Sequence, residues 1–392
     1  MKEKTGVQIA YCQSNSIFSA IQGLKAQFDG CEISLLIVFA SSYFDQTLLC
    51  RSLQRSFPES EIIGCSTAGE VVSDHFLQGS IVAMALTKQV LDDFHIEVVE
   101  NLREELNLSP ALKGFENHFG CTLERIDHQA YVGLVLIDGM SMMEEKFMES
   151  LGDKTNLVFI GGSAGDDLQF QETFVYAKGK VYTNAAVLAV LKPKDGFDIL
   201  KTQSFCPSEK QLIPTKVDSA TRTVLEFDGK PAAQAYAEAL GVKMSDLPSL
   251  FMRHPLGLMA DGEPFVRSPQ KLSGEALTFY CRIVEGVPLA ILNPLDIVED
   301  TQKVLAAKIA EIGPVKGIID FQCILRTLQL REEGQTDAYV QLFEGLPMIG
   351  FSTYGEAYLG HMNQTSTMLI FKGRSGNSHP LQGIGMKRVT AL

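Results

Sequence analysis

The chain has 392 residues, of which 45% are hydrophobic, and this is enough to build two or three hydrophobic cores. Lys and Arg number 34 against 47 Asp and Glu, which gives a net charge of −13. No basic helix interrupts this acidic balance, so the composition argues against nucleic acid or an anionic membrane as the main partner.

Targeting and redox signals favour a cytoplasmic protein. The first residues run into a strand pattern without a secretory apolar core, and no stretch approaches the roughly 20 apolar residues that cross a bilayer. The eight cysteines are scattered and form no C-x-x-C pair or zinc-type cluster. We therefore expect reduced, mostly buried cysteines and no membrane insertion.

The first half of the chain alternates strand and helix patterns. Strand patterns occur at residues 7–11, 33–39, 62–63, 81–86, 96–99 and 132–137, and helical patterns at 17–28, 44–57, 112–119 and 142–151. Such alternation predicts a parallel or mixed sheet covered by helices. From residue 174 the pattern changes to hairpins, with a turn at 178–180.

The second half begins near residue 225. A helix that stops at Gly241 is followed by turn-rich segments at 253–257 and 265–269, a helix at 296–312 and apolar runs at 317–325 and 348–349. We predict an α/β fold of two related halves with mixed β-sheets flanked by helices, divided into residues 1–222 and 223–372. Residues 373–392 are rich in Gly, Ser and basic side chains, so we predict a loosely ordered tail there.

One motif, G-x-S-T-x-G-E, occurs twice, at residues 64–70 and 350–356, and each copy follows an apolar strand pattern. A shorter version at 161–166 again closes with a glycine and an acid. Glycines let backbone N–H groups approach a ligand, hydroxyls donate or accept hydrogen bonds, and a carboxylate can hold an ammonium group. We predict that these three glycine loops line a site for a small polar ligand.

The candidate ligand residues come from these loops, from the end of the buried strand 132–137, and from arginines that can pair with a carboxylate. They are Gly64, Ser66, Thr67, Gly69, Glu70, Asp138, Gly162, Ser163, Asp166, Arg267, Arg326, Ser352, Thr353, Gly355 and Glu356. For a ligand that carries an ammonium group and a carboxylate, Glu70 or Glu356 would take the ammonium group, and backbone N–H groups with an arginine would take the carboxylate.

A serine hydrolase is a minor alternative. Residues 161–165 also satisfy G-x-S-x-G, the nucleophile elbow in which Ser163 would attack an ester. An elbow is followed at once by a helix, whereas the residues after Asp166 lead into a hairpin-like pattern. We therefore expect a protein that is not an enzyme.

The motifs together resemble FIST proteins, which carry an N-terminal and a C-terminal FIST domain. The resemblance is carried by residues 63–70, 159–166, 227–232 with the helix up to Gly241, and 350–356, which span most of the chain in the expected order. It implies a non-catalytic intracellular sensor that binds a small ligand such as an amino acid. It also implies a signalling partner such as a histidine kinase or a cyclic-dinucleotide enzyme.

Some family members of similar size are haem proteins that sense nitric oxide and regulate a partner kinase. Haem needs an axial ligand in an apolar pocket, and His254 and His361 are the candidates near the C-terminal glycine loop. The chain has no C-x-x-C-H motif, so any haem would be non-covalent haem b. The resemblance does not decide between haem and an amino acid, and the sequence leaves both open.

Overall fold

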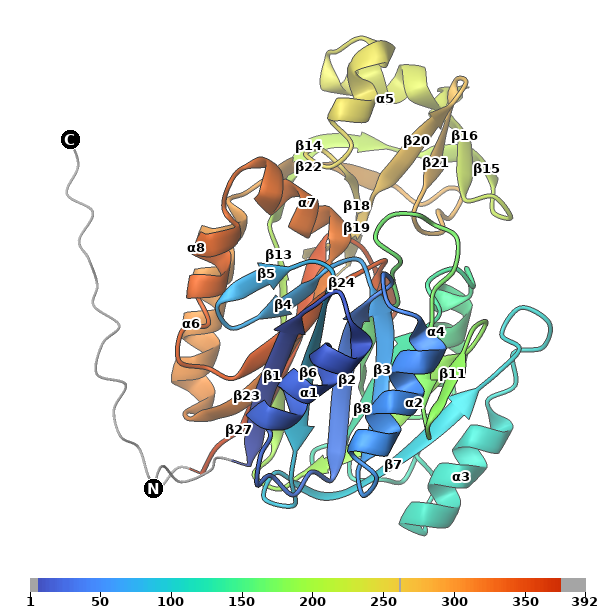
Figure 1. Ribbon diagram of the computed structural model, residues 1–392. Coiled ribbons are helices and arrows are strands. Elements are labelled where there is room, and N and C mark those ends of the chain that lie inside the picture. The colour runs from blue at the N-terminus through green and yellow to red at the C-terminus, as the bar shows by residue number, and fades with distance from the viewer. Residues whose placement is uncertain (1–5, 261, 375–392) are drawn as a thin grey trace, which may run out of the picture.

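The computed structural model describes residues 6–260 and 262–374 (Figure 1). The α/β class with mixed sheets flanked by helices is confirmed. The predicted loose tail at 373–392 lies outside the described residues from 375 onward. No helix within the described ranges combines the length and the hydropathy needed to cross a bilayer.

The main body consists of three units that share one order of elements: strand, helix, strand, helix, strand, short hairpin, strand. The first unit is β1 (Val7–Gln13), α1 (Ile17–Gln27), β2 (Leu35–Ser41), α2 (Gln46–Ser56), β3 (Glu61–Thr67), β4 (Glu70–Val72), β5 (His75–Leu77) and β6 (Ser80–Leu86). The second is β7 (Leu91–Val99), α3 (Ser109–Phe119), β8 (Val132–Ile137), α4 (Glu144–Gly152), β9 (Phe159–Ser163), β10 (Val175–Ala177), β11 (Lys180–Tyr182) and β12 (Ala186–Pro193).

The third unit repeats this order but carries an inserted domain after its first strand. It is β13 (Phe197–Gln203), α6 (Ile297–Ile312), β23 (Val315–Cys323), α7 (Ile324–Glu332), α8 (Thr336–Gln341), β24 (Met348–Thr353), β25 (Glu356–Tyr358), β26 (His361–Met362) and β27 (Thr365–Lys372). The predicted apolar run at 317–325 therefore splits, because β23 ends at Cys323 and α7 begins at the next residue. Cys323 keeps an extended conformation (φ −57°, ψ 135°) and turns the chain without a loop.

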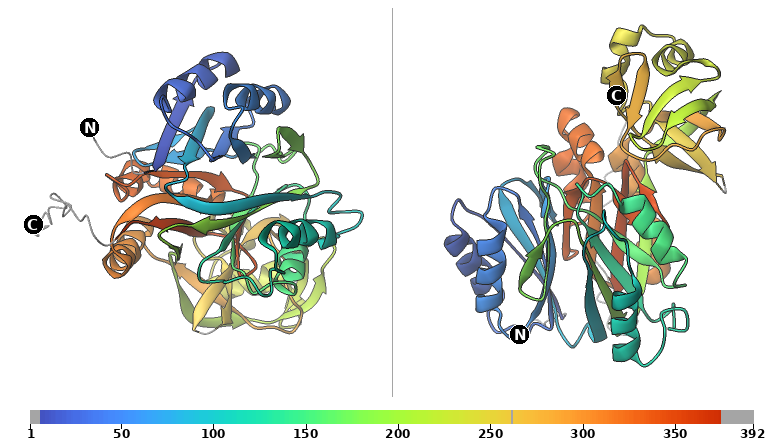
Figure 2. Two further views of the ribbon diagram at one scale, coloured as in Figure 1. Left: turned by 90° about the horizontal axis from the view of Figure 1, so that it is seen from below. Right: turned by 90° about the vertical axis from the view of Figure 1, so that its right-hand side faces the viewer.

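Each unit completes its sheet with a hairpin from another unit. The strand orders are β1-β6-β2-β3-β10-β11, β7-β12-β8-β9-β25-β26 and β13-β27-β23-β24-β4-β5. The hairpin of the second unit pairs with β3, that of the third with β9, and that of the first with β24. The exchange runs once around the molecule, and Figure 2 shows the helices of the units on the outside with the strands between them.

A shared core lies between the three sheets. Phe39 on β2, Phe321 on β23 and Phe351 on β24 meet there, with 4.5 Å between the ring centroids of Phe39 and Phe351. Three further cores lie under the outer helices, so the central strands are buried on both faces. This explains why they read as continuous apolar runs in the sequence.

The inserted domain lies beyond one end of the three sheets, at the top of Figure 1. It contains β14 (Phe205–Leu212), β15 (Pro214–Asp218), β16 (Thr223–Phe227), β17 (Lys230–Pro231), α5 (Ala232–Leu240), the 3-10 helix η1 (Met244–Ser249), β18 (Leu256–Ala260), β19 (Glu263–Arg267), β20 (Pro269–Ser273), β21 (Ala276–Phe279) and β22 (Leu289–Pro294). The predicted division between residues 222 and 223 falls at the turn between β15 and β16.

The first glycine of each motif has the same structural task. A Cβ atom at these positions would lie 1.7–2.3 Å from the carbonyl oxygen of the residue opposite on the adjacent parallel strand, which no side chain tolerates. The pairs are Gly64 with Val38, Gly161 with Val135, and Gly350 with Asp320. The repeated glycine thus permits close strand packing just before each loop.

Candidate functional site

The three glycine loops bind one another in a closed ring, which we call the loop ring: residues 64–70 (N-terminal loop), 161–166 (middle loop) and 350–356 (C-terminal loop). Each motif serine contacts another loop. Ser66 accepts from the amide of Gly165 (3.0 Å) and donates its hydroxyl to the Gly165 carbonyl (2.8 Å). The N-terminal and middle loops are therefore joined by both backbone and side chain.

In the other two contacts of the ring, a motif serine again forms a hydrogen bond with a glycine of another loop. The Ser163 amide donates to the Gly355 carbonyl (2.9 Å), and the Ser352 amide donates to the Gly69 carbonyl (2.8 Å). The structure thus brings together the predicted residues of all three loops. Their backbone groups are largely occupied by one another.

The two motif glutamates are buried and bonded within their own segments. Both Glu70 and Glu356 are 0% exposed. Glu70 accepts from the Thr67 hydroxyl and from the amide and hydroxyl of Ser80, at 3.1 and 2.5 Å. Glu356 repeats this pattern with the Thr353 hydroxyl and with the amide (3.1 Å) and hydroxyl (2.7 Å) of Thr365.

Burial governs the protonation of these glutamates. It raises the pKa of Glu70 to about 7 and that of Glu356 to about 8, although the hydroxyl and amide donors favour the charged form. Each carboxyl group links its glycine loop to the first residue of the strand that follows the hairpin, Ser80 of β6 for Glu70 and Thr365 of β27 for Glu356. Their predicted role as ammonium ligands stays a prediction, and neither group faces solvent.

The two predicted aspartates shape the neighbouring segments. Asp166 accepts from the amides of Phe170 (2.9 Å), Gln171 (2.6 Å) and Glu172 (3.1 Å), and from the Tyr354 hydroxyl. Asp138 likewise accepts from the Met140 amide (2.9 Å), the Thr173 hydroxyl and the Asn184 amide. Both carboxylates therefore accept hydrogen bonds from groups of the protein itself.

The predicted arginines also have internal partners. Arg326 is 1% exposed and donates to four side-chain oxygens. They belong to Ser204, Thr202, Thr301 and Gln322. Arg267 donates to the Val266 carbonyl at 3.2 Å.

Two charged residues beside the ring were absent from the sequence-based candidates. Asp167 directly follows the middle loop, and its Oδ2 accepts from the hydroxyls of Ser41 (3.0 Å) and Ser42 (2.8 Å). Arg331, in the last turn of α7, lies against Gly69, where a Cβ would come within 3.2 Å of Nη2. The acid doublet at 166–167 was a weak signal for Asp167, whereas nothing in the sequence links Arg331 to the loops.

A charged cluster joins the inserted domain to α4. The Arg222 guanidinium contacts Glu144 at 3.2 Å and Glu145 at 2.5 Å, and the side chains are only 12%, 5% and 18% exposed. Glu145 also accepts from the Arg282 amide at 2.8 Å. This cluster fixes the inserted domain on the second unit.

His361 does not fit a haem iron. Its ring packs against Gly355, where a Cβ would lie 2.0 Å from Cε1, and the residue is 7% exposed. Burial, with the nearby charges of Arg222 and Arg267, lowers the pKa of His361 to about 4. The neutral ring fills space inside the protein and leaves none for a macrocycle.

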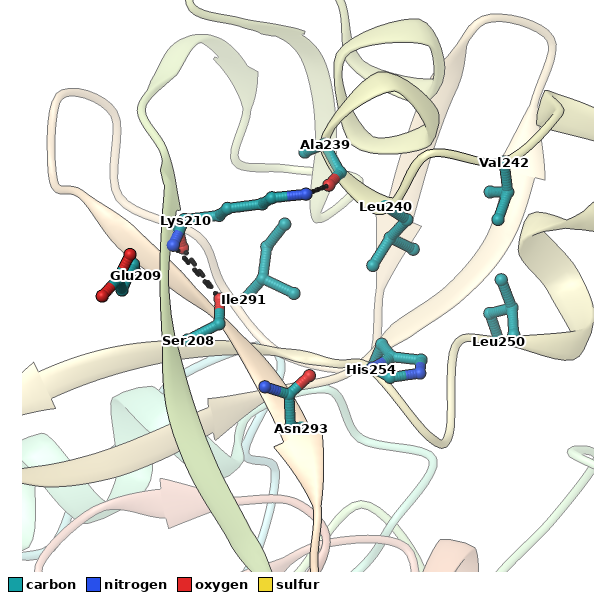
Figure 3. Close-up of a pocket in the computed structure, with 10 residues that line it drawn as sticks. All are labelled: Ser208, Glu209, Lys210, Ala239, Leu240, Val242, Leu250, His254, Ile291 and Asn293. Atoms are coloured by element: carbon teal, nitrogen blue, oxygen red, sulfur yellow. Dashed lines mark hydrogen bonds between the residues drawn. The ribbon is translucent and has the colours of Figure 1, made fainter.

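His254 is better placed than His361 to be an axial ligand of a haem iron. It lines a cavity of about 500 Å³ in the inserted domain, together with the apolar Leu240, Val242, Leu250 and Ile291 (Figure 3). Its Nδ1 lies 3.3 Å from the Leu292 carbonyl, so that nitrogen carries the proton. Nε2 has no hydrogen-bond partner among the described residues and remains open to a ligand.

The cavities and the loop ring are separate features. A second, larger hollow of about 1220 Å³ lies near the start of β1 and includes Lys88 and Lys194. The residues that line the two cavities include none of the loop ring. The exposed edge of the ring, which we call its rim, is formed by residues 167–170, next to the middle loop, and by Tyr354, on which Phe170 stacks.

Ser163 has the backbone role described above. It is 1% exposed and ends β9, and the chain then enters the bonded segment 166–172 and the β10–β11 hairpin. Within the described ranges, the histidine side chains that form hydrogen bonds do so with Glu97, Asp93 and the Leu292 carbonyl, and none with Ser163. The geometry around Ser163 does not support the alternative of a serine hydrolase.

Comparison with known proteins places two domains of one family on this chain. The family model of the FIST N domain matches residues 34–230, and that of the FIST C domain matches residues 232–358. An uncharacterized protein from Methanocaldococcus jannaschii is 26% identical over 278 residues, which cover 66% of this chain and 54% of the relative. The chain thus spans about half the length of the curated relative that it matches.

The buried glutamates predict a pH-dependent stability. Both folded pKa values exceed the ordinary 4.5, so the folded chain keeps protons that the unfolded chain releases above about pH 4.5. The free energy of unfolding should therefore fall as pH rises from about 4.5 to about 8, by roughly 3–5 kcal/mol per carboxyl. Glu70→Gln with Glu356→Gln, which mimics the protonated acids, should flatten this slope in urea unfolding at several pH values.

The exposed Glu59 provides the control. Glu59→Gln should keep the wild-type slope. An unchanged slope in the double variant would show that the two glutamates do not titrate in this range.

Proposed function

The chain belongs to the FIST family, whose domains are sensory domains of signalling proteins, and we propose that it senses a small polar ligand at the rim of the loop ring. The observation that carries this proposal is the ring itself. Two of its loops lie in the FIST N match and the third in the FIST C match. A ligand at the rim touches both domains at the carboxyl ends of their strands, where α/β proteins bind ligands.

The surroundings of the ring offer a route from ligand to output. Ala68 of the N-terminal loop and Tyr354 of the C-terminal loop pack in one cluster with Met252 and Tyr280 of the inserted domain. Glu333, just after α7, forms an ion pair with Arg253 of the inserted domain at 3.2 Å. A ligand that shifts the loops or the end of α7 would thereby change how the inserted domain is held.

The partner in this proposal is a signalling protein, such as a histidine kinase or a cyclic-dinucleotide enzyme, in the cytoplasm. The family assignment supports a signalling partner, and the net charge of −13 makes nucleic acid an unfavourable one. The proposal is non-catalytic, since the polar groups of the loops hold the fold together. Binding energy at the rim would alter a docking surface and drive no reaction.

A tryptophan reporter tests the ligand site. The chain contains no tryptophan, so a single Trp is an unmixed signal. Phe170 is 42% exposed and stacks on Tyr354 of the C-terminal loop at 4.9 Å. We expect the emission of the Phe170→Trp variant to shift when one of the twenty standard amino acids binds, because the ligand changes the solvent exposure of the indole side chain.

Leu225→Trp is the matched control. Leu225 is 38% exposed on β16 of the inserted domain, and it is not a member of the cluster through which the loop ring contacts that domain. Its emission should stay constant in the same titration. A silent Phe170→Trp reporter against the whole panel would contradict ligand binding at the rim.

Haem b at His254 is the second candidate function. The supporting observation is the open Nε2 beside four apolar side chains in the cavity of about 500 Å³. A bound haem would supply an iron that takes diatomic gases such as nitric oxide. His254 would hold the iron, and the Leu292 carbonyl would orient its imidazole ring. Lys210 on the cavity wall donates to the Ala239 carbonyl at 2.5 Å and would have to exchange this partner to bind a propionate.

Haemin titration distinguishes this second candidate. It predicts a stoichiometric Soret band that shifts with nitric oxide after reduction and is lost in His254→Ala. The exposed His128 gives the control, since His128→Ala should retain the band. A titration with only weak, non-saturating absorbance in the wild type would remove haem from consideration.

A further inference from the structure

Arg331 is a half-buried cation whose guanidinium has no hydrogen-bond partner in the part of the chain that the structure describes. Its guanidinium makes no hydrogen bond and no ion pair with any residue that the structure describes. The other inward arginines differ, because Arg222 binds two glutamates and Arg326 binds four oxygens. A partly desolvated guanidinium that lacks acceptors is unfavourable for the free protein and favourable for binding an anion.

The position of Arg331 is set by the loop ring. Gly69 has φ 126°, a conformation that side chains rarely adopt, and a Cβ there would lie 3.2 Å from Nη2, so the glycine lets the guanidinium approach the loop closely. The Ser352 hydroxyl of the C-terminal loop lies 3.5 Å from the same Cβ position. The guanidinium therefore lies where the N-terminal and C-terminal loops meet.

Asp167 is the electrostatic neighbour of Arg331. Burial lowers the pKa of the Arg331 guanidinium, while the carboxylates of Glu70 and Asp167 partly offset this. Glu70 is fully buried, but Asp167 is half-buried, and its Oδ2 accepts hydrogen bonds from Ser41 and Ser42. No described residue donates to Oδ1 of Asp167, which leaves this oxygen available to a ligand.

The segment that carries Asp167 is held in a strained shape. Asp167, Leu168 and Phe170 have φ of 53°, 65° and 52°, in the left-handed region. The Asp166 carboxylate and the Tyr354 hydroxyl bond this segment and maintain it. Strain that the surroundings enforce in this way is typical of sites that are organised before the ligand arrives.

We propose that Arg331 binds the carboxylate of the sensed ligand and that Asp167 binds an ammonium group of the same molecule. This assignment rests on the proposed function and replaces the buried glutamates as the ammonium ligands. The guanidinium fork matches a carboxylate through two parallel hydrogen bonds. The exposed Leu168 (40%) and Phe170 (42%) lie beside Asp167 in sequence and would face an apolar part of the ligand.

The test combines matched ligands with matched variants in calorimetric titrations of the full chain. The probes are the twenty standard amino acids and, for the tightest binder, its carboxamide and its des-amino acid. Arg331→Gln should raise the Kd of the amino acid at least tenfold and leave the Kd of the carboxamide, which binds weakly already, unchanged. Asp167→Asn should raise the Kd of the amino acid and leave the Kd of the des-amino acid unchanged.

Controls separate binding from folding. Arg55 is exposed at the end of α2, and Arg55→Gln should keep the wild-type Kd. Arg331→Gln should keep or raise the melting temperature without ligand, because the guanidinium holds nothing in place; a clear drop would indicate a structural role and overturn the proposal.

Three outcomes contradict the assignment in different ways. Wild-type affinity in Arg331→Gln, together with a responding Phe170→Trp reporter, would overturn this assignment and leave the rim site standing. Binding of inorganic phosphate in preference to every amino acid would replace the carboxylate with a different anion. If no amino acid binds and the reporter is silent, the proposed function fails as well.

Discussion

The exchange of backbone hydrogen bonds among the three glycine loops is the contact on which the rest of the structure depends. Each motif serine reaches another loop, and the hairpin that follows each loop completes the sheet of another unit. The three sheets therefore cannot separate without breaking the ring. Because the ring joins segments nearly 300 residues apart, it also makes the two FIST domains one structural body.

The ring consumes most of the polar groups that its motifs contain. Glu70 and Glu356 bind hydroxyls and amides of their own segments, and Asp166 binds three amides of the segment after it. Buried polar groups need such partners, since an unmade hydrogen bond inside a protein costs about 1–3 kcal/mol. Beside the ring, Arg331 and Oδ1 of Asp167 have no hydrogen-bond partner among the described residues, so these are the groups that we propose for the ligand.

Much of the fold follows from local sequence patterns. Alternating apolar runs predicted the strands and helices of the first two units, and Asp45 and Asp296 cap α2 and α6 through amides at 2.8 Å. The three copies of the motif correctly indicated three equivalent strand ends. The exchange of hairpins was not predictable, because two- or three-residue strands carry no information about which sheet they join.

The site shows the same limit. The repeated motif was enough to identify Gly64 and Ser66 as important residues. It could not show which distant strands and loops these two residues contact. Arg331 looks like any basic residue in the last turn of a helix, where a cation suits the helix dipole. Only the tertiary approach of α7 to Gly69 gives it a special environment, and no local pattern encodes that approach.

Hydrogen–deuterium exchange of the whole chain, with and without a saturating amino acid found by calorimetry, tests the central claim most directly. Bound ligand should slow exchange in residues 64–70, 161–172 and 350–356 together, and in the inserted-domain contacts around residues 252–253. Protection confined to residues 208–210 and 239–254, around the cavity of the inserted domain, would contradict a ligand-binding loop ring.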